Sequence, residues 1–161
     1  MKKRLSLGVL LFYFAMPALF GLPPRVQSPA AGEPSQERFI GAWRLVSLEQ
    51  VDAGGKMHDA ECTGQLVFTS DGHISVQVMY LNPQNDTQAG AAQYVRGGYE
   101  ASFGTYRVDE RTQTFTYHVN GALVRTLIGK DLPRLYKFSG DRLVVKSARP
   151  DEHWQVTWEH D

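Results

Sequence analysis

The sequence predicts an all-β domain that closes into an up-and-down antiparallel β-barrel of eight or nine strands. Apolar and polar residues alternate with a period of two over most of the chain after residue 40. The turns "AGGK", "SDGH" and "SGDR" supply glycine where a positive φ is needed. Consecutive hairpins favour a meander, and a meander of this length avoids exposed edges best by closing on itself.

The strands are predicted from this alternation and from the turns between them. No long amphipathic helix interrupts the series. The nine predicted strands are Ala42–Val51, Gly64–Thr69, His73–Leu81, Tyr99–Val108, Thr112–Asn120, Leu123–Ile128, Arg134–Phe138, Arg142–Ser147 and Trp154–Glu159.

The N-terminus has the pattern of a secretory signal peptide, which we assign to residues 1–22. Lys2, Lys3 and Arg4 precede an uncharged apolar run that ends at Leu22. The run is close to the shortest length that spans a bilayer, and Pro17 interrupts it. We therefore expect an exported protein, periplasmic or secreted, with an uncleaved membrane anchor as the alternative.

A flexible linker is predicted over residues 23–37, because "PPRVQSPAAGEPSQ" is rich in Pro, Ala, Ser and Gly. The barrel domain is predicted over residues 38–161, with a short helical turn in "QERFIG" before the first strand. The 17 basic and 17 acidic residues balance, so there is no basic excess to bind a nucleic acid. Cys62 is the sole cysteine of the sequence, so no disulfide can form within the chain.

The connection between Leu81 and Gly98 is longer than the other turns. Its sequence, "NPQNDTQAGAAQYVRG", contains Asp86 and Thr87, either of which could cap a short helix that reaches Tyr94. We expect this helix to serve either as a plug over one barrel end or as a lid over a ligand entrance.

Several blocks of the sequence resemble the lipocalin-like domain family of small bacterial and fungal proteins. They are "GAWRLVSLE" (41–49), "GQLVFTSDGHISVQVM" (64–79), "YEASFGTYRVDE" (99–110), "YHVNG" (117–121) and "KFSGDRLVV" (137–145). The resemblance implies a small closed barrel with an internal cavity and implies no known reaction. The sequence departs from the family at one pair of positions: relatives tend to have two adjacent histidines there, and this chain has Tyr117 and His118. An Arg that would cover Trp43 is also not evident after Trp158.

Alternation decides which side chains enter the barrel. Trp43, Leu45 and Ser47 share a face of the first strand, and Trp43 is expected to form the barrel floor. Leu66 and Phe68 share the inward phase of the second strand.

The third strand allows two registers. Hydrophobicity turns Ile74, Val76 and Val78 inward and exposes Gln77. In the alternative register Gln77 faces the cavity and hydrogen-bonds a ligand, because a slip of one residue exchanges the two faces.

The stretch "GTYRVDERTQTFTYHVNG" poses the same question for Tyr117 and His118. Phe115, Tyr117 and Val119 form the apolar set of their strand, which places Tyr117 inside and His118 outside. A β-bulge would exchange the two. Arg125 is expected at the surface; if it faced inward, it would suit a ligand carboxylate.

The sequence contains no recognisable motif for binding a cofactor or a catalytic metal. The sequence lacks a Gly-rich phosphate loop, a G-x-S-x-G elbow and an H-E-x-x-H motif. The group "HDAEC" (58–62) is more typical of a polar turn than of a zinc site. We therefore expect neither a cofactor nor a metal.

The favoured function is the binding of a small hydrophobic molecule inside the barrel. The predicted ligand-binding residues are Trp43, Phe68, Gln77, Tyr106, Phe115, Tyr117, His118 and Tyr136. One alternative is a cofactor-independent cyclase or isomerase of a hydrophobic metabolite, with Tyr117 or His118 moving a proton. The other is a structural or envelope barrel whose interior is filled.

Overall fold

The computed structural model describes residues 36–52, 54–82 and 94–161. Contacts divide the chain into two units, Met1–Ala31 and Gly32–Asp161, and every described residue belongs to the second. No helix among the described residues is long and apolar enough to cross a membrane. The predicted signal peptide and nearly all of the predicted lid helix lie outside the described residues; of that helix only Tyr94 is described, in a single 3₁₀ position.

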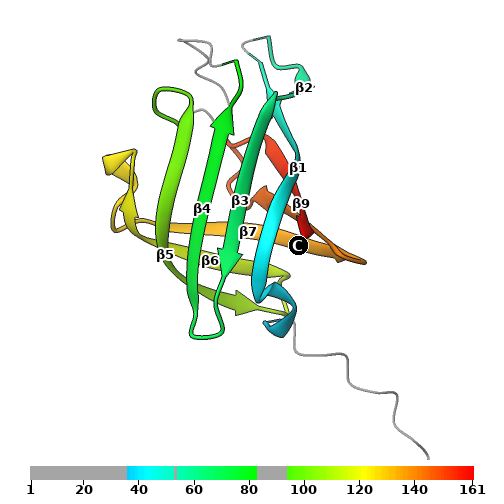
Figure 1. The fold of residues 1–161 in the computed structure, drawn as a ribbon, viewed down its shortest axis with the longest axis vertical. Helices are drawn as coiled ribbons and strands as arrows, with labels where there is room; N and C mark the ends of the chain where they lie inside the picture. The colour runs from blue at the N-terminus through cyan, green and yellow to red at the C-terminus, as the bar shows by residue number, and fades with distance from the viewer. Residues whose placement is uncertain (1–35, 53, 83–93) are drawn as a thin grey trace, which may run out of the picture. The chain divides into compact units, whose positions relative to one another are not determined.

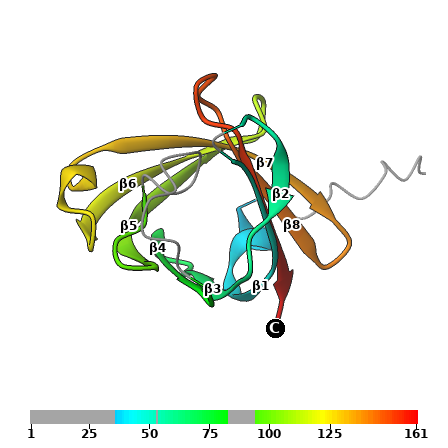
Figure 2. The ribbon, with the colours of Figure 1, turned by 90° about the horizontal axis from the view of Figure 1, so that it is seen from above.

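The second unit is a closed antiparallel barrel, as predicted (Figures 1 and 2). Its strands follow one another around the ring in chain order, and β9 returns to pair with β1. The strands are β1 (Gly41–Val51), β2 (Met57–Asp59), β3 (Cys62–Phe68), β4 (His73–Tyr80), β5 (Tyr99–Asp109), β6 (Thr114–Ala122), β7 (Asp131–Ser139), β8 (Arg142–Ser147) and β9 (Trp154–His160).

Eight of these strands make the barrel, and β2 is an additional short strand. β1 pairs with β3 through its first residues and with β2 through its last, so β2 and β3 lie one after the other along the same edge of β1. The sequence did not predict β2, because its three residues are all exposed and show no apolar alternation.

One predicted strand is wrong. Leu123–Ile128 forms a loop that contains the 3₁₀ turn η3 (Arg125–Leu127). Gly129 follows with a φ of 79°, and its N–H donates to the carbonyl of Val119, so the chain turns back here to start β7. Arg125 is exposed in this turn and does not reach the barrel interior.

The turn η1 (Glu37–Phe39) plugs one end of the barrel, where Figure 1 shows it below the strands. Phe39 is fully buried, and its ring contacts the rings of five aromatic residues at centroid distances between 4.8 and 6.0 Å. These residues are Phe68, Tyr106, Phe115, Tyr136 and Phe138. The expected helical turn before the first strand is thus confirmed, and it fills the interior at this end.

Trp43 forms the floor of the same end, as expected from its place at the start of β1. Its indole N–H donates to the carbonyl of Phe39 over 2.8 Å, which ties η1 to the strand. The ring of His160 packs edge-on against Trp43 at 4.7 Å, in the place where the family resemblance would have put an Arg.

A bulge in β1 changes which of its residues face the barrel interior. The register with β9 shifts between Leu45 and Ser47, so Leu48 and Gln50 turn inward in place of Ser47 and Glu49. The sequence gave no sign of this bulge, because "LVSLEQV" contains no glycine.

Candidate functional site

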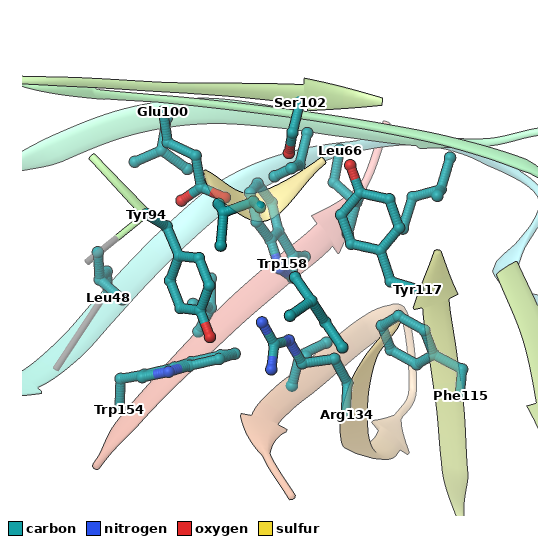
Figure 3. A pocket seen from close by; sticks show the side chains of 17 residues that line it. Leu48, Leu66, Tyr94, Glu100, Ser102, Phe115, Tyr117, Arg134, Trp154 and Trp158 are labelled. Atoms are coloured by element: carbon teal, nitrogen blue, oxygen red, sulfur yellow. The ribbon is translucent and has the colours of Figure 1, made fainter. Parts of the chain in front are cut away.

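A cavity occupies the part of the barrel that the aromatic plug leaves unfilled (Figure 3). Its free volume is about 80 Å³. Its apolar lining residues include Leu48, Leu66, Ile74, Val76, Val78, Leu132, Val145, Val156 and Trp158. Each of the eight barrel strands contributes at least one lining residue.

Four polar side chains face this space, together with Tyr94 at its edge. Glu100 and Ser102 project from β5, Tyr117 projects from β6, and Arg134 projects from β7. Figure 3 shows the Glu100 carboxyl and the Arg134 guanidinium approaching the cavity from opposite walls. A largely apolar wall with a few convergent polar groups is the usual composition of a small-molecule site.

Glu100 makes no hydrogen bond or ion pair with any described residue. Burial raises the pKa of its carboxyl to about 7, against a smaller opposing effect of the Arg134 charge. The carboxyl is therefore neutral in mildly acidic solution and ionised above neutrality.

Arg134 is almost fully buried and contacts two aromatic rings, a carbonyl oxygen and a carboxylate. Its guanidinium lies over the rings of Tyr94 at 5.1 Å and Trp154 at 4.9 Å. Its Nη1 donates to the carbonyl of Pro133 over 3.2 Å and lies 3.5 Å from a carboxylate oxygen of Glu152.

Glu152 is the buried partner that balances this cation. The hydroxyls of Tyr94 and Ser147 each donate to its Oε2 over 2.7 Å, and the Nε of Arg149 lies 3.2 Å from its Oε1. Burial raises the pKa of Glu152, but these hydrogen bonds and the two guanidinium charges outweigh burial, and the net shift is downward. Glu152 therefore stays ionised, and Arg134 is neutralised before any ligand arrives.

Tyr117 points into the cavity and His118 points out of the barrel, as the favoured reading of the alternation predicts. The Tyr117 hydroxyl has no hydrogen bond of ordinary geometry to a described residue, although Ser102 is close enough to lower its pKa slightly. Burial dominates and raises the pKa of Tyr117 to about 12. The phenol thus remains a neutral donor or acceptor at every physiological pH.

The predicted ligand-binding residues fall into three groups. Phe115 and Tyr117 line the cavity. Four others do not line the cavity and belong instead to the packed aromatic end: Trp43, Phe68, Tyr106 and Tyr136. Phe39 fills the space that these four would otherwise have enclosed.

Gln77 and His118 lie outside the barrel, so their predicted place in the cavity is wrong. Gln77 is exposed on β4 because Ile74, Val76 and Val78 take the inward phase. The Nδ1 of His118 lies 2.8 Å from an Asp131 carboxylate oxygen on the outer surface.

Glu100 and Arg134 are absent from the predicted ligand-binding residues, although alternation along their strands places both side chains on the inner face. Glu100 lies six residues before Tyr106 on β5, and Arg134 lies two residues before Tyr136 on β7. Both tyrosines were assigned inward, so the same alternation places the two charged residues inward as well. Charged residues are usually found at the protein surface, and for this reason neither residue was predicted to face the cavity.

No metal site is formed by the part of the chain that the structure describes. No three or more His, Cys, Asp or Glu side chains come together there in an arrangement that could hold an ion. Burial raises the pKa of the Cys62 thiol to about 11, which makes this cysteine a poor nucleophile.

Comparison with known proteins assigns the fold family. The sequence model of the lipocalin-like domain family matches residues 40–160, which is most of the chain. The chain belongs to the lipocalin-like domain family. The family resemblance seen in the sequence blocks is thereby confirmed.

Other comparisons add little to this family assignment. No curated protein matches the chain significantly. Among solved structures, a redesigned β-barrel is similar with 11% identity, a TM-score of 0.43, and coverage of 78% of this chain and 94% of that chain. A variant of the fluorescent protein UnaG is similar with 14% identity, a TM-score of 0.39, and coverage of 78% and 97%. Both scores are below 0.5, so neither likeness bears on the function of this lipocalin-like protein.

Proposed function

We propose that this lipocalin-like protein binds a small, largely apolar molecule in the barrel cavity. The observation that carries the proposal is the composition of the cavity wall. Aliphatic and aromatic side chains surround the free space, while Glu100, Ser102 and Tyr117 present polar groups to it. Burying apolar ligand surface against such a wall supplies the affinity, and the polar groups orient the ligand.

The volume of the cavity limits the size of the ligand. Sites for drug-sized ligands have volumes of about 300–1,000 Å³. The free volume here is about 80 Å³, enough for several water molecules. We therefore expect a ligand of about one ring or a short chain, whose binding shifts the adjacent side chains slightly.

Tryptophan fluorescence tests this proposal, because Trp154 and Trp158 line the cavity whereas Trp43 lies in the packed end. Benzyl alcohol is a suitable neutral probe of one ring. We expect a saturable change in emission when the wild-type protein is titrated with it.

Adjacent residues of β8 offer a matched pair of variants. Val145 faces the cavity, and Val144 faces outward on the next position of the strand. Val145→Phe should fill the cavity and abolish the change, and Val144→Phe should leave it intact. An unsaturable response, or the same saturable response in both variants, would show that the cavity is not the binding site.

Export completes the proposal. We infer that residues 1–22 direct the chain out of the cytoplasm, since a basic start is followed by an apolar run in that segment. Residues 23–37 would then link the processed N-terminus to the barrel. Expression in a Gram-negative host should yield a periplasmic protein whose mass lacks the first segment. A full-length mass in the cytoplasmic fraction would contradict export, and a full-length mass in the membrane would indicate an anchor.

A cofactor-independent isomerase is the second candidate, with Glu100 in place of His118 as the base. The outward side chain of His118 removes the base that the sequence suggested. The Glu100 carboxylate could take a proton from the carbon beside a carbonyl group, leaving an enolate whose oxygen accepts a hydrogen bond from Tyr117. Exchange of the methyl protons of acetophenone in D₂O tests this. Glu100→Gln should abolish any exchange above the buffer rate, and no exchange by the wild type would exclude the activity for this ketone.

A further inference from the structure

We propose that the cavity selects a small amine in its protonated form, held by the Glu100 carboxylate within a wall of aliphatic and aromatic side chains. This inference rests on the proposed function and specifies the chemical class of the ligand. It follows from how the charges around the cavity are paired.

Glu100 is the charged group of the cavity that the protein leaves without a partner among the described residues. Its carboxyl reaches the free space from the start of β5, beside Tyr94 and across from Arg134 (Figure 3). The two side chains influence each other electrostatically but form no ion pair. The Glu100 side chain is half-buried, and a carboxyl that loses part of its water without gaining a hydrogen-bond donor carries a desolvation cost, which a ligand N–H donor would offset.

Arg134 is not available to a ligand carboxylate in the same way. Its charge is balanced by Glu152 at 3.5 Å, and its guanidinium lies against the rings of Tyr94 and Trp154. An anionic ligand would have to compete with Glu152 and would also be repelled by Glu100. The arrangement of charges therefore disfavours acids and favours cations.

The remaining wall of the cavity also suits an ammonium group. The rings of Phe115, Tyr117 and Trp158 line it, and the faces of such rings attract cations. The hydroxyls of Ser102 and Tyr117 can accept the N–H groups that Glu100 does not reach.

The ionisation of Glu100 makes the selection dependent on pH. The titratable groups that interact with Glu100 are Arg134 on β7, Tyr117 on β6 and Tyr80 on β4. Burial raises the pKa of both tyrosines well above neutrality, and the guanidinium stays charged. Glu100, with a pKa of about 7, is the member of this group that titrates between pH 6 and 8. An ammonium ligand needs the carboxylate, so its affinity should rise over this interval.

Three probes of nearly equal size distinguish the ligand classes: benzylamine, benzyl alcohol and benzoate. Their dissociation constants would be measured by Trp fluorescence with the full chain at pH 6 and pH 8. We expect benzylamine to bind about tenfold more tightly than benzyl alcohol at pH 8, which is the effect of one charge-assisted hydrogen bond. Benzoate should bind most weakly, and the advantage of benzylamine should shrink at pH 6.

Two variants assign the preference to Glu100. Glu100→Gln should remove the advantage of benzylamine over benzyl alcohol and its pH dependence, so that the two probes bind with similar affinity at both pH values. Glu49→Gln is the matched control, because Glu49 lies on the outside of β1, where it accepts a hydrogen bond from Gln155. This control should behave as the wild type does.

The outcomes separate this inference from the proposed function. Tighter binding of benzoate than of benzylamine, or an amine preference that survives Glu100→Gln, would overturn the amine site while the binding function stands. Failure of all three probes to bind would overturn both. The wild-type pH series needs no variant, so it tests the inference even if Glu100→Gln does not fold.

Discussion

The two ends of this barrel are built from the same alternating strands but are filled in different ways. At the plugged end, Phe39 enters from η1 and meets a continuous set of aromatic rings. At the other end the walls stay apart, and charged residues face the space between them. The segment that precedes the first strand therefore decides which part of the interior is core and which part is cavity.

The polar groups of the two ends differ in part in how they are satisfied. In the plugged end the Trp43 N–H and the Tyr106 hydroxyl donate to backbone carbonyls, at 2.8 and 3.2 Å. In the cavity the hydroxyl of Tyr117 and the carboxyl of Glu100 have no such partner among the described residues. The packed end also holds one unpaired hydroxyl, that of Tyr136, so what sets the cavity end apart is that its unpaired groups, Tyr117 and Glu100, face free space that a ligand could occupy.

The largest expected effect comes from emptying the plugged end. Phe39→Ala removes the ring at the centre of the aromatic contacts and should lower the free energy of unfolding by about 3–5 kcal/mol. Leu48→Ala at the cavity should cost about 2 kcal/mol, at the low end for such truncations, because Leu48 already borders free space. Urea denaturation measures both. Equal losses would remove the distinction between the two ends.

The next effect concerns the buried charge pair. Glu152→Gln leaves the Arg134 guanidinium buried without its carboxylate and should cost about 3 kcal/mol in urea denaturation. A second change, Arg134→Met, should recover much of this loss because no unpaired charge then remains. A double variant no more stable than the single one would show that the pair does not act as a unit.

A smaller effect follows from the titration of Glu100. Its pKa rises from an ordinary value near 4.5 to about 7 on folding, so the folded state binds the proton more tightly than the unfolded state does. Stability should therefore fall as the pH rises from about 4.5 through 7 and should level off above that.

Thermal or urea unfolding of the wild type and Glu100→Gln at pH 5 and pH 8 isolates this contribution. The wild type should lose about 1–2 kcal/mol more than the variant between the two values, less than the full shift implies, because the carboxyl keeps some contact with water. An identical pH dependence in both proteins would show that Glu100 is not buried as described.

The smallest effect is expected outside the barrel. His118→Asn alters a side-chain contact between His118 and Asp131, both exposed, and should change stability by less than about 0.5 kcal/mol. It should leave the titration with benzyl alcohol unchanged. A marked loss of binding would place His118 in the site after all.

Sequence periodicity predicted the fold well because the strands are half-buried and the turns carry glycine. It placed Tyr117, Phe115 and the valines of β4 on the inner face, and the structure agrees. The periodicity gave a wrong prediction at two places. Leu123–Ile128 was predicted as a strand and forms a loop, and the bulge in β1 before Leu48 changes which residues face inward. Neither failure has a clear composition signal.

The candidate site was harder to predict than the fold. Alternation gives the face of a residue but not the depth at which the barrel is filled, so Trp43, Phe68, Tyr106 and Tyr136 were assigned to a cavity that Phe39 occupies. The two charged residues that do face the cavity, Glu100 and Arg134, were passed over because burial of a charge is uncommon.

The most direct test of a cavity at one end and a filled core at the other is methyl-resolved NMR during a titration with benzyl alcohol. We predict saturable shifts of the methyl signals of Leu66, Ile74, Val78 and Val145, which line the cavity. The signals of Val46 and Leu135, which are exposed on the outer surface, should stay unchanged. Shifts confined to the outer residues, or no saturable shift of the inner ones, would contradict the account.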